Sequence, residues 1–247
     1  EMKFLVIGDS CTDIFVYGRC DRMAPAAPVP VFLSGREVRN MGMAGNVYKN
    51  IISLEADCDI ITNTAELTKT RFVEDKTNHM LLRLDSDEGS VDRITGIEEI
   101  KYDDYDAIVI SDYDKGFLTE EDIENISQRH PLVFLDTKKI LGEWAKNVTY
   151  IKINEIEYTK TRHTLGEWCE DSLIVTLGSG GCKYQDKIFP VTRVEIRDLI
   201  GAGDTFLASL VYNFVKRGNI YVAIDFANER ATQVVQQRGV NTARWIQ

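Results

Sequence analysis

Short apolar runs, each flanked by turn-forming residues, recur along the whole chain. They cover residues 3–7, 59–62, 107–111, 132–135, 150–153 and 173–177. Their length and β-branched content predict strands buried in a sheet. Helical patterns lie at 45–54 and 119–129, and two more, 202–216 and 220–237, close the chain. Thr119, with Asp122 three positions later, is typical of a helix start, and residues 217–219 form a helix stop and turn.

Strands that alternate with helices predict parallel βαβ units, and therefore one α/β domain. Two segments, 29–38 and 70–85, break this rhythm: a cluster of prolines at 25, 28 and 30 marks the start of the first, and polar and apolar residues alternate imperfectly in the second. We expect them to form strands outside the main sheet. A small β-sheet lid, drawn from about residues 11–40 and 68–86, would cover the ligand edge of the sheet and exclude water.

Composition narrows the class of protein. The 247 residues, 44% hydrophobic and 28% charged, suffice for one globular domain spanning 1–247. The net charge of −10 gives no broad basic surface, so we expect neither a nucleic-acid nor a membrane partner. Five scattered cysteines without a C-x-x-C pair indicate neither disulfides nor zinc. With no membrane-length apolar run, and a strand pattern directly at the N-terminus, the expected location is the cytoplasm.

The strongest chemical signal is the segment 198–206, D-L-I-G-A-G-D-T-F, where a polar turn meets a long helical pattern. Gly201, Ala202 and Gly203 present main-chain amides at a helix start, and the glycines let a phosphate approach, so they predict an anion hole. Asp204 at the same helix end could accept the proton of an attacking hydroxyl. The alternative is a plain glycine turn with an acidic helix cap.

Other segments, taken in order, give the chain a family resemblance. The G-A-G-D run resembles the C-terminal signature of the PfkB (ribokinase-like) sugar kinases, and G-M-A-G-N at 42–46 resembles their N-terminal signature. Similar segments are V-I-G-D at 6–9, S-D-Y-D-K-G at 111–116, N-E-I-E at 154–157, T-L-G-S-G-G at 176–181 and F-A-N at 226–228. The proline-rich stretch 21–31 looks like that of bacterial D-glycero-β-D-manno-heptose 7-phosphate kinases. The resemblance implies a ribokinase-like three-layer sandwich with a mostly parallel sheet and a small β-sheet lid.

The resemblance also implies roles for individual residues. Asp204 would be the catalytic base beside the anion hole, ATP the phosphoryl donor and Mg²⁺ its metal. Substrate binding is implied for Asp13, Gly42, Asn46 and Lys115. Nucleotide binding is implied for Asn154, Thr176, Gly178, Gly181 and Asn228. Glu157 with Asn154 would hold Mg²⁺, mainly through water.

Each of these assignments has a structural alternative. Asp13 could be a turn residue, Asn154 and Glu157 a helix start, and 176–181 a plain hairpin turn. Lys115 and Lys138 follow predicted strands, at the edge where such sheets bind ligands, and either could meet a sugar phosphate or only solvent. Arg71 and Arg83 on the lid are weaker candidates. The lid strands resemble those through which relatives pair, so a homodimer through the lid and a charge-protected strand edge both remain open.

Three departures from the family pattern bear on activity. Met43 replaces the second glycine of the N-terminal signature, Ile200 stands where threonine is usual, and the stretch 58–70 is shorter than in the heptose kinases. The first hypothesis is an ATP-dependent kinase of a phosphorylated sugar, with heptose 7-phosphate the best guess. The alternatives are a catalytically silent sugar or nucleotide sensor of the same fold, and a kinase for ribose, fructose phosphate or a nucleoside.

Overall fold

The computed structural model describes residues 2–86 and 91–242 and contains one large sheet. Within these residues eight strands pair in the order β12-β11-β10-β9-β8-β7-β1-β4. The strands from β4 to β10 run parallel, whereas β11 and β12 are antiparallel additions at the other edge. The strands are β1 (Lys3–Gly8), β4 (Asp57–Ile61), β7 (Ala107–Asp112), β8 (Val133–Thr137), β9 (Tyr150–Asn154), β10 (Leu173–Thr176), β11 (Cys182–Tyr184) and β12 (Lys187–Phe189).

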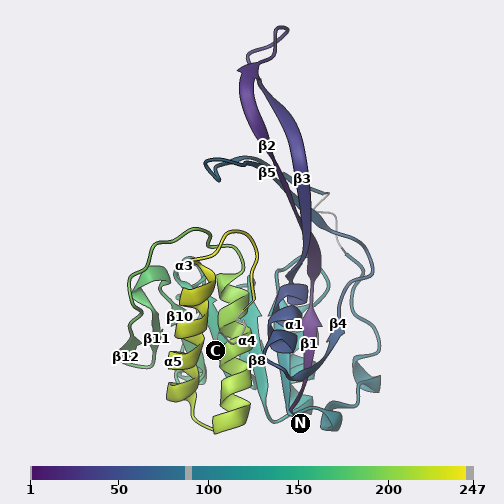
Figure 1. The fold of residues 1–247 in the computed structure, drawn as a ribbon. Helices are drawn as coiled ribbons and strands as arrows, with labels where there is room; N and C mark the ends of the chain where they lie inside the picture. The colour runs from purple at the N-terminus through teal and green to yellow at the C-terminus, as the bar shows by residue number, and fades with distance from the viewer. Residues whose placement is uncertain (1, 87–90, 243–247) are drawn as a thin grey trace.

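Helices cover both faces of this sheet (Figure 1). On one face lie α1 (Ala44–Ser53), α4 (Ala202–Arg217) and α5 (Ile220–Val234), and on the other lies α2 (Glu120–Arg129). The predicted helix start at Thr119 is confirmed, because Thr119 and Asp122 form a reciprocal capping box. Shorter helical segments are α3 (Glu155–Thr161) and the 3₁₀ turns η1 (Ile97–Glu99), η2 (Tyr102–Asp104), η3 (Glu143–Ala145), η4 (Glu167–Cys169) and η5 (Gly178–Gly180).

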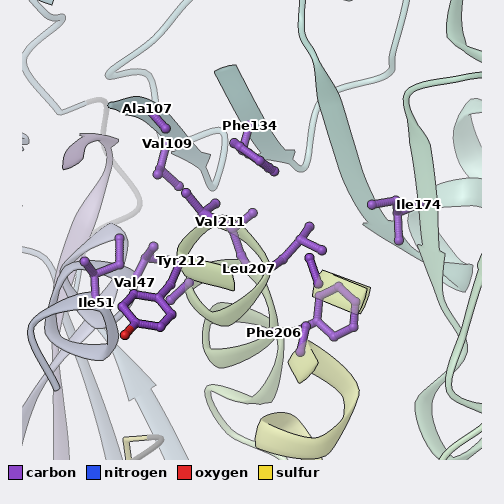
Figure 2. Packing of buried hydrophobic residues seen from close by; sticks show 14 of the residues in the cluster. Val47, Ile51, Ala107, Val109, Phe134, Ile174, Phe206, Leu207, Val211 and Tyr212 are labelled. Carbon is purple, nitrogen blue, oxygen red and sulfur yellow. The ribbon is translucent and has the colours of Figure 1, made fainter. Parts of the chain in front are cut away.

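The alternation of side chains along the parallel strands divides the core into two layers. In β1, Phe4 and Val6 join the cluster under α1, α4 and α5, whereas Leu5 and Ile7 join the cluster under α2. Both faces of the sheet are therefore buried, as the continuous apolar runs predicted. Figure 2 shows Leu207 and Val211 of α4 lying toward the sheet residues Val109 and Phe134. This packing fixes the start of α4 at the carboxyl end of the sheet.

A second sheet projects from the first as the predicted lid. Among the described residues it has four strands in the order β3-β2-β5-β6. They are β2 (Ser10–Met23), β3 (Pro30–Met43), β5 (Thr68–Glu74) and β6 (Met80–Asp85). Figure 1 shows β2 and β3 as a long ribbon that extends well beyond the helices. The predicted strand at 29–38 is therefore longer than expected, because its pairing with β2 continues to Met43, the residue before α1.

The fold differs from the sequence prediction mainly at its edges. Strands β11 and β12 were not predicted, and α5 ends at Val234, three residues before the predicted end. Strand β4 is an edge strand, and the chain passes from Ile61 to Thr68 of the lid without an intervening strand or helix. This direct passage is the structural counterpart of the short 58–70 stretch. No described helix is both long and apolar enough to cross a bilayer.

Candidate active site

The start of α4 holds the segment with the strongest sequence signal. Gly201 is the N-cap, with φ 80° and ψ 0°, and its carbonyl accepts the first helical hydrogen bond, from the Thr205 N–H at 2.9 Å. A side chain is disfavoured here twice over, because the conformation is left-handed and a Cβ would lie 2.7 Å from Nδ2 of Asn46. The turn leads directly into the main chain of Ala202 and Gly203, where the sequence predicted an anion hole, and the Ala202 N–H donates to the Leu199 carbonyl at 3.3 Å.

Asp204 lies in the first turn of α4 with both carboxylate oxygens hydrogen-bonded. Oδ1 accepts from the Tyr113 hydroxyl at 2.7 Å, and Oδ2 accepts from Nδ2 of Asn46 at 2.9 Å. The side chain is almost fully buried. Burial raises the pKa of Asp204 to about 6, although the hydrogen bonds from Asn46 and Tyr113 oppose the rise. A carboxylate with this pKa is still ionised at neutral pH and is a stronger base than an exposed one.

A pocket of about 410 Å³ opens beside the same turn. Its lining joins Ala202 and Gly203 to all the predicted nucleotide-binding residues except Asn154, namely Thr176, Gly178, Gly181 and Asn228. Gly178 has open space where a side chain would be. Asn228 lies at the pocket wall and donates to the Phe189 carbonyl at 3.1 Å. The fold thus brings residues from three separate sequence segments to one cavity that reaches the first residues of α4.

The segment 176–181 also has the alternative, purely structural role. Thr176 pairs with Cys182 in the antiparallel ladder of β10 and β11, so the segment is the turn of a hairpin. The Gly181 O accepts from the Leu177 N–H at 2.8 Å and closes this turn. A hairpin turn that lines a pocket satisfies both interpretations, because its geometry presents main chain to the cavity.

Asn154 and Glu157 form the start of α3. Asn154 is the N-cap, and the two side chains make a reciprocal capping box. Oε1 of Glu157 also accepts from the ammonium of Lys138, which lies 3.8 Å from Oδ1 of Asp136 as well, so Lys138 is paired with carboxylates in this structure. Its pKa is raised: burial alone would lower it, but Asp136 and Glu157 outweigh that effect.

The same residues fit Mg²⁺ only through water. No group of three or more acidic, histidine or cysteine side chains among the described residues could cage an ion. Glu157 already accepts hydrogen bonds on both carboxylate oxygens. The buried Oδ1 of Asp136, however, has no hydrogen-bond partner in the described part of the chain. This oxygen lies 3.8 Å from the ammonium of Lys138 and can still accept a hydrogen bond from a water of a hydrated Mg²⁺, which keeps several of its waters.

Asp13 lies on the lid strand β2 and is paired with Arg71 of β5. Both side chains are almost completely buried, and the guanidinium hydrogen-bonds to Oδ1 of Asp13. The second oxygen, Oδ2, lies so close to Gly42 that a Cβ there would approach within 2.3 Å. Gly42 therefore gives Asp13 the room to sit at the base of the lid. Asn46, implied as a sugar ligand, instead donates to Asp204 in this structure.

The position of Lys115 is fixed by a hydrogen bond from its main chain. Its N–H donates to Oδ2 of the fully buried Asp9 at 2.8 Å, and the Tyr113 N–H donates to Oδ1 of Asp9 at 2.6 Å. Asp9 thus fixes the loop after β7 and directs the Tyr113 hydroxyl to Asp204. Through these hydrogen bonds the loop links Asp9, which follows β1, to Asp204 at the start of α4.

The two unusual residues of the signatures have distinct environments. Met43 has φ 59° and ψ −130°, a conformation that residues with a side chain rarely adopt, which explains why glycine is usual at this position. Its sulfur lies 3.3 Å from the ammonium of Lys69 on the lid. Ile200 packs against the cluster of Phe15, Tyr17 and Val240 and so connects the anion-hole turn with the lid.

Sequence reasoning missed several residues of this site. Tyr113 was seen only as part of a motif, and Lys69, Asp136 and Lys152 were not singled out. Lys152 and Asp136 had a detectable signal, since each is a charged residue within a short apolar strand that is otherwise buried. Lys69 lies on a half-exposed strand, where a lysine carries no such signal.

Comparison with solved structures defines the class of protein. The fold matches a ribokinase from Thermotoga maritima with a TM-score of 0.71, at 16% identity over 97% of this chain and 95% of that one. It matches phosphofructokinase-2 from Escherichia coli, in complex with potassium, with a TM-score of 0.71, at 11% identity over 98% and 95% of the two chains. The structure is therefore a ribokinase-like fold.

Sequence comparison gives the family. Residues 104–246 match the model of the pfkB family carbohydrate kinases, so the chain belongs to this family, whose members are phosphotransferases with an alcohol acceptor. It is 30% identical to the bifunctional protein HldE of a Nitratiruptor species, over 98% of this chain and 63% of that protein. The HldE of a Helicobacter pylori strain is also 30% identical, over 96% and 63%. The chain thus spans less than two thirds of these relatives.

The alignment with the Nitratiruptor protein extends over 291 positions, more than the 247 residues of this chain. The relative therefore carries residues that this chain lacks.

Proposed function

We propose that the protein is an ATP-dependent kinase that transfers the γ-phosphoryl group to a hydroxyl of a phosphorylated sugar, with heptose 7-phosphate as the preferred acceptor. One observation carries the proposal: the buried carboxylate of Asp204 lies in the first turn of α4, where Ala202 and Gly203 line a pocket of about 410 Å³. Base, anion hole and nucleotide-sized cavity thus meet at one helix end.

The acceptor hydroxyl would give its proton to Asp204. Each carboxylate oxygen has two lone pairs, so the hydroxyl can bind beside the hydrogen bonds from Tyr113 and Asn46. Those two donors hold the carboxylate in one orientation.

The acceptor oxygen forms a new bond to the γ-phosphorus while the bond from that phosphorus to the bridging oxygen of ADP breaks. The main-chain amides after Gly201 stabilise the charge on the transferring oxygens.

ATP would lie in the pocket between 176–181 and α5, with its terminal phosphate at Gly203. Residues of β10, η5, α4 and α5 line this cavity, and its apolar side chains, among them Val191, Val194 and Phe206, suit a base. Asp136 and Glu157 would hold Mg²⁺ through water, and the ion when bound would neutralise phosphate charge. Asn154 orients Glu157 in this arrangement through the capping box.

A phosphorylated sugar is favoured by cationic side chains between the lid and the sheet. The ammonium of Lys69 lies 5.3 Å from the centre of the Tyr113 ring, directly beside the catalytic loop. No carboxylate within 4 Å pairs with Lys69 in the described part of the chain, so a sugar phosphate could take that place. Two further observations support heptose as the sugar. Segment 21–31 resembles that of the heptose 7-phosphate kinases, and the chain is similar to HldE proteins.

The proposal is tested by measuring ADP release with ATP, Mg²⁺ and one acceptor at a time. Heptose 7-phosphate, fructose 6-phosphate and ribose are the informative acceptors, because they separate the phosphate requirement from the sugar length. We expect release with heptose 7-phosphate to exceed release with ribose by at least about 100-fold. Turnover with ribose alone would reject the phosphosugar assignment, and release with none of the acceptors would favour the sensor hypothesis.

We further propose that two copies pair through the lid. Strand β6 is an edge strand of the small sheet, and its side chains Met80, Leu81, Leu82 and Leu84 are all exposed. An unprotected apolar edge strand is normally covered by another strand.

A further inference from the structure

Lys152 is a buried lysine in the middle of the main sheet. It lies in β9 between Ile151 and Ile153, and only 3% of its surface is exposed. Because side chains alternate along a strand, Lys152 points away from the α2 face, where these isoleucines pack, and toward the face covered by α4. Its register partner on β8 is Asp136, and the ammonium lies 2.6 Å from Oδ2 of that carboxylate.

The ammonium reaches the anion hole. A methyl group placed on Gly203 would lie 3.0 Å from Nζ of Lys152, a separation tighter than nine in ten real contacts of a Cβ. Because Gly203 has no side chain, a ligand that lies against the main chain at the start of α4 can contact the ammonium of Lys152. The positive charge also acts on the neighbouring Asp204, whose pKa it lowers against the larger effect of burial.

The ion pair with Asp136 leaves hydrogen-bonding capacity on both partners. Within residues 2–86 and 91–242 the ammonium makes one hydrogen bond, to Oδ2 of Asp136, so two of its three N–H groups are left for a ligand. Oδ1 of Asp136 is buried without a hydrogen-bond partner. A buried ion pair is seldom more stabilising than an apolar pair of similar size. Stability alone therefore does not explain a lysine at this position, whereas a ligand with negative charge does.

We propose that Lys152 is a second catalytic residue, whose ammonium binds the phosphoryl group during transfer, and that Asp136 positions it. The inference rests on the proposed kinase function and deepens it. While the acceptor oxygen bonds to the γ-phosphorus and the bridging bond to ADP breaks, negative charge spreads over the three remaining oxygens. The ammonium donates to one of these oxygens and stays protonated, and the acceptor's proton goes to Asp204.

Binding of a transition-state mimic separates this role from a structural one. ADP with Mg²⁺ and aluminium fluoride places a planar anion where the phosphoryl group passes, whereas ADP alone does not. We compare Lys152→Arg with Lys152→Met, because both variants keep Asp136, which would hold Mg²⁺, and only the arginine keeps a cation beside it. The melting temperature identifies any variant that fails to fold.

We expect both variants to bind ADP within about 3-fold of each other. Aluminium fluoride should tighten ADP binding in Lys152→Arg, and this gain should fall by about 10²-fold in Lys152→Met, the usual effect of losing one donor to a developing anion. Equal tightening in two folded variants would overturn the assignment of Lys152 alone. Absence of both the tightening and any sugar-dependent ADP release in the wild type would overturn the kinase function as well.

Discussion

The phenolic hydroxyl of Tyr113 donates a hydrogen bond of 2.7 Å to Oδ1 of Asp204, across 91 residues of sequence. The bond joins the loop after β7 to the start of α4, and Asp9 anchors the tyrosine through its main chain. Burial raises the pKa of Tyr113 well above its usual value, so the phenol stays protonated and remains a donor. Tyr113 is thus one of two neutral groups that tune the base.

Replacing Tyr113 with phenylalanine should shift the pH dependence of catalysis. The pKa of Asp204 is about 6 in the wild type, and loss of a donor to the carboxylate should raise it further. The acid limb of kcat/KM, which reports the free enzyme, should therefore move to higher pH. A profile of initial rates from about pH 5 to 9 measures the shift, with Tyr105→Phe, a tyrosine that hydrogen-bonds Asp59, as the control. An unchanged or lower midpoint would contradict the role given to Tyr113.

Asp204→Asn should make the folded protein more stable at neutral pH. The folded-state pKa of about 6 exceeds the unfolded value of 3.8, so the folded state disfavours the charged form. The resulting penalty is absent below pH 3.8, grows up to about pH 6 and is complete above it, where it amounts to roughly 3 kcal/mol. Urea unfolding at about pH 7.5 and about pH 4 should show a gain for the variant that is larger at the higher pH. A gain that is larger at the lower pH would refute this assignment.

Alanine at Gly201 should impair both stability and turnover. The left-handed conformation costs about 1–2 kcal/mol for a residue with a side chain, and the Cβ would displace Asn46 from Asp204. Gly218 at the other end of α4 is a matched control, because it has φ 66° and nothing within 4 Å of a Cβ. We expect both variants to lose stability in urea and only Gly201→Ala to lose kcat. Equal kcat in the two variants would show that the turn does not set the catalytic geometry.

The proposed dimer predicts a specific effect of lid substitutions. Leu82 and Leu84 are each 58% exposed on the edge strand β6, and glutamates there would place charge in the interface without disturbing a core. Sedimentation velocity should show the dimer for the wild type and a monomer for Leu82→Glu/Leu84→Glu. A control pair, Ile156→Glu and Ile188→Glu, alters exposed apolar residues away from the lid. Identical sedimentation of the wild type and the lid variant would reject the interface.

The main sheet was predictable because its parallel strands are short, mostly apolar runs. The three-residue strands β11 and β12 were not, since so few residues carry no periodicity. The length of the lid ribbon was underestimated because β2 and β3 are stabilised by pairing with each other, which a single segment does not reveal.

The glycine turn, Asp204 and the residues around the nucleotide pocket were identified by motif. The partners of these residues were not, because hydrogen bonds such as those from Tyr113 and Asn46 to Asp204 join positions far apart in sequence. Asp13 shows the same limit. Its burial against Arg71 depends on the pairing of β2 with β5, which places their residues in register.

Phosphoryl transfer by Asp204→Asn, measured as ADP release with saturating ATP and heptose 7-phosphate, tests the general base most directly. The account predicts a rate lower than that of the wild type by about 10²–10⁴-fold, with ATP affinity little changed, because the asparagine fills the same space but cannot take up the proton. Equal ADP release by the two proteins would contradict it.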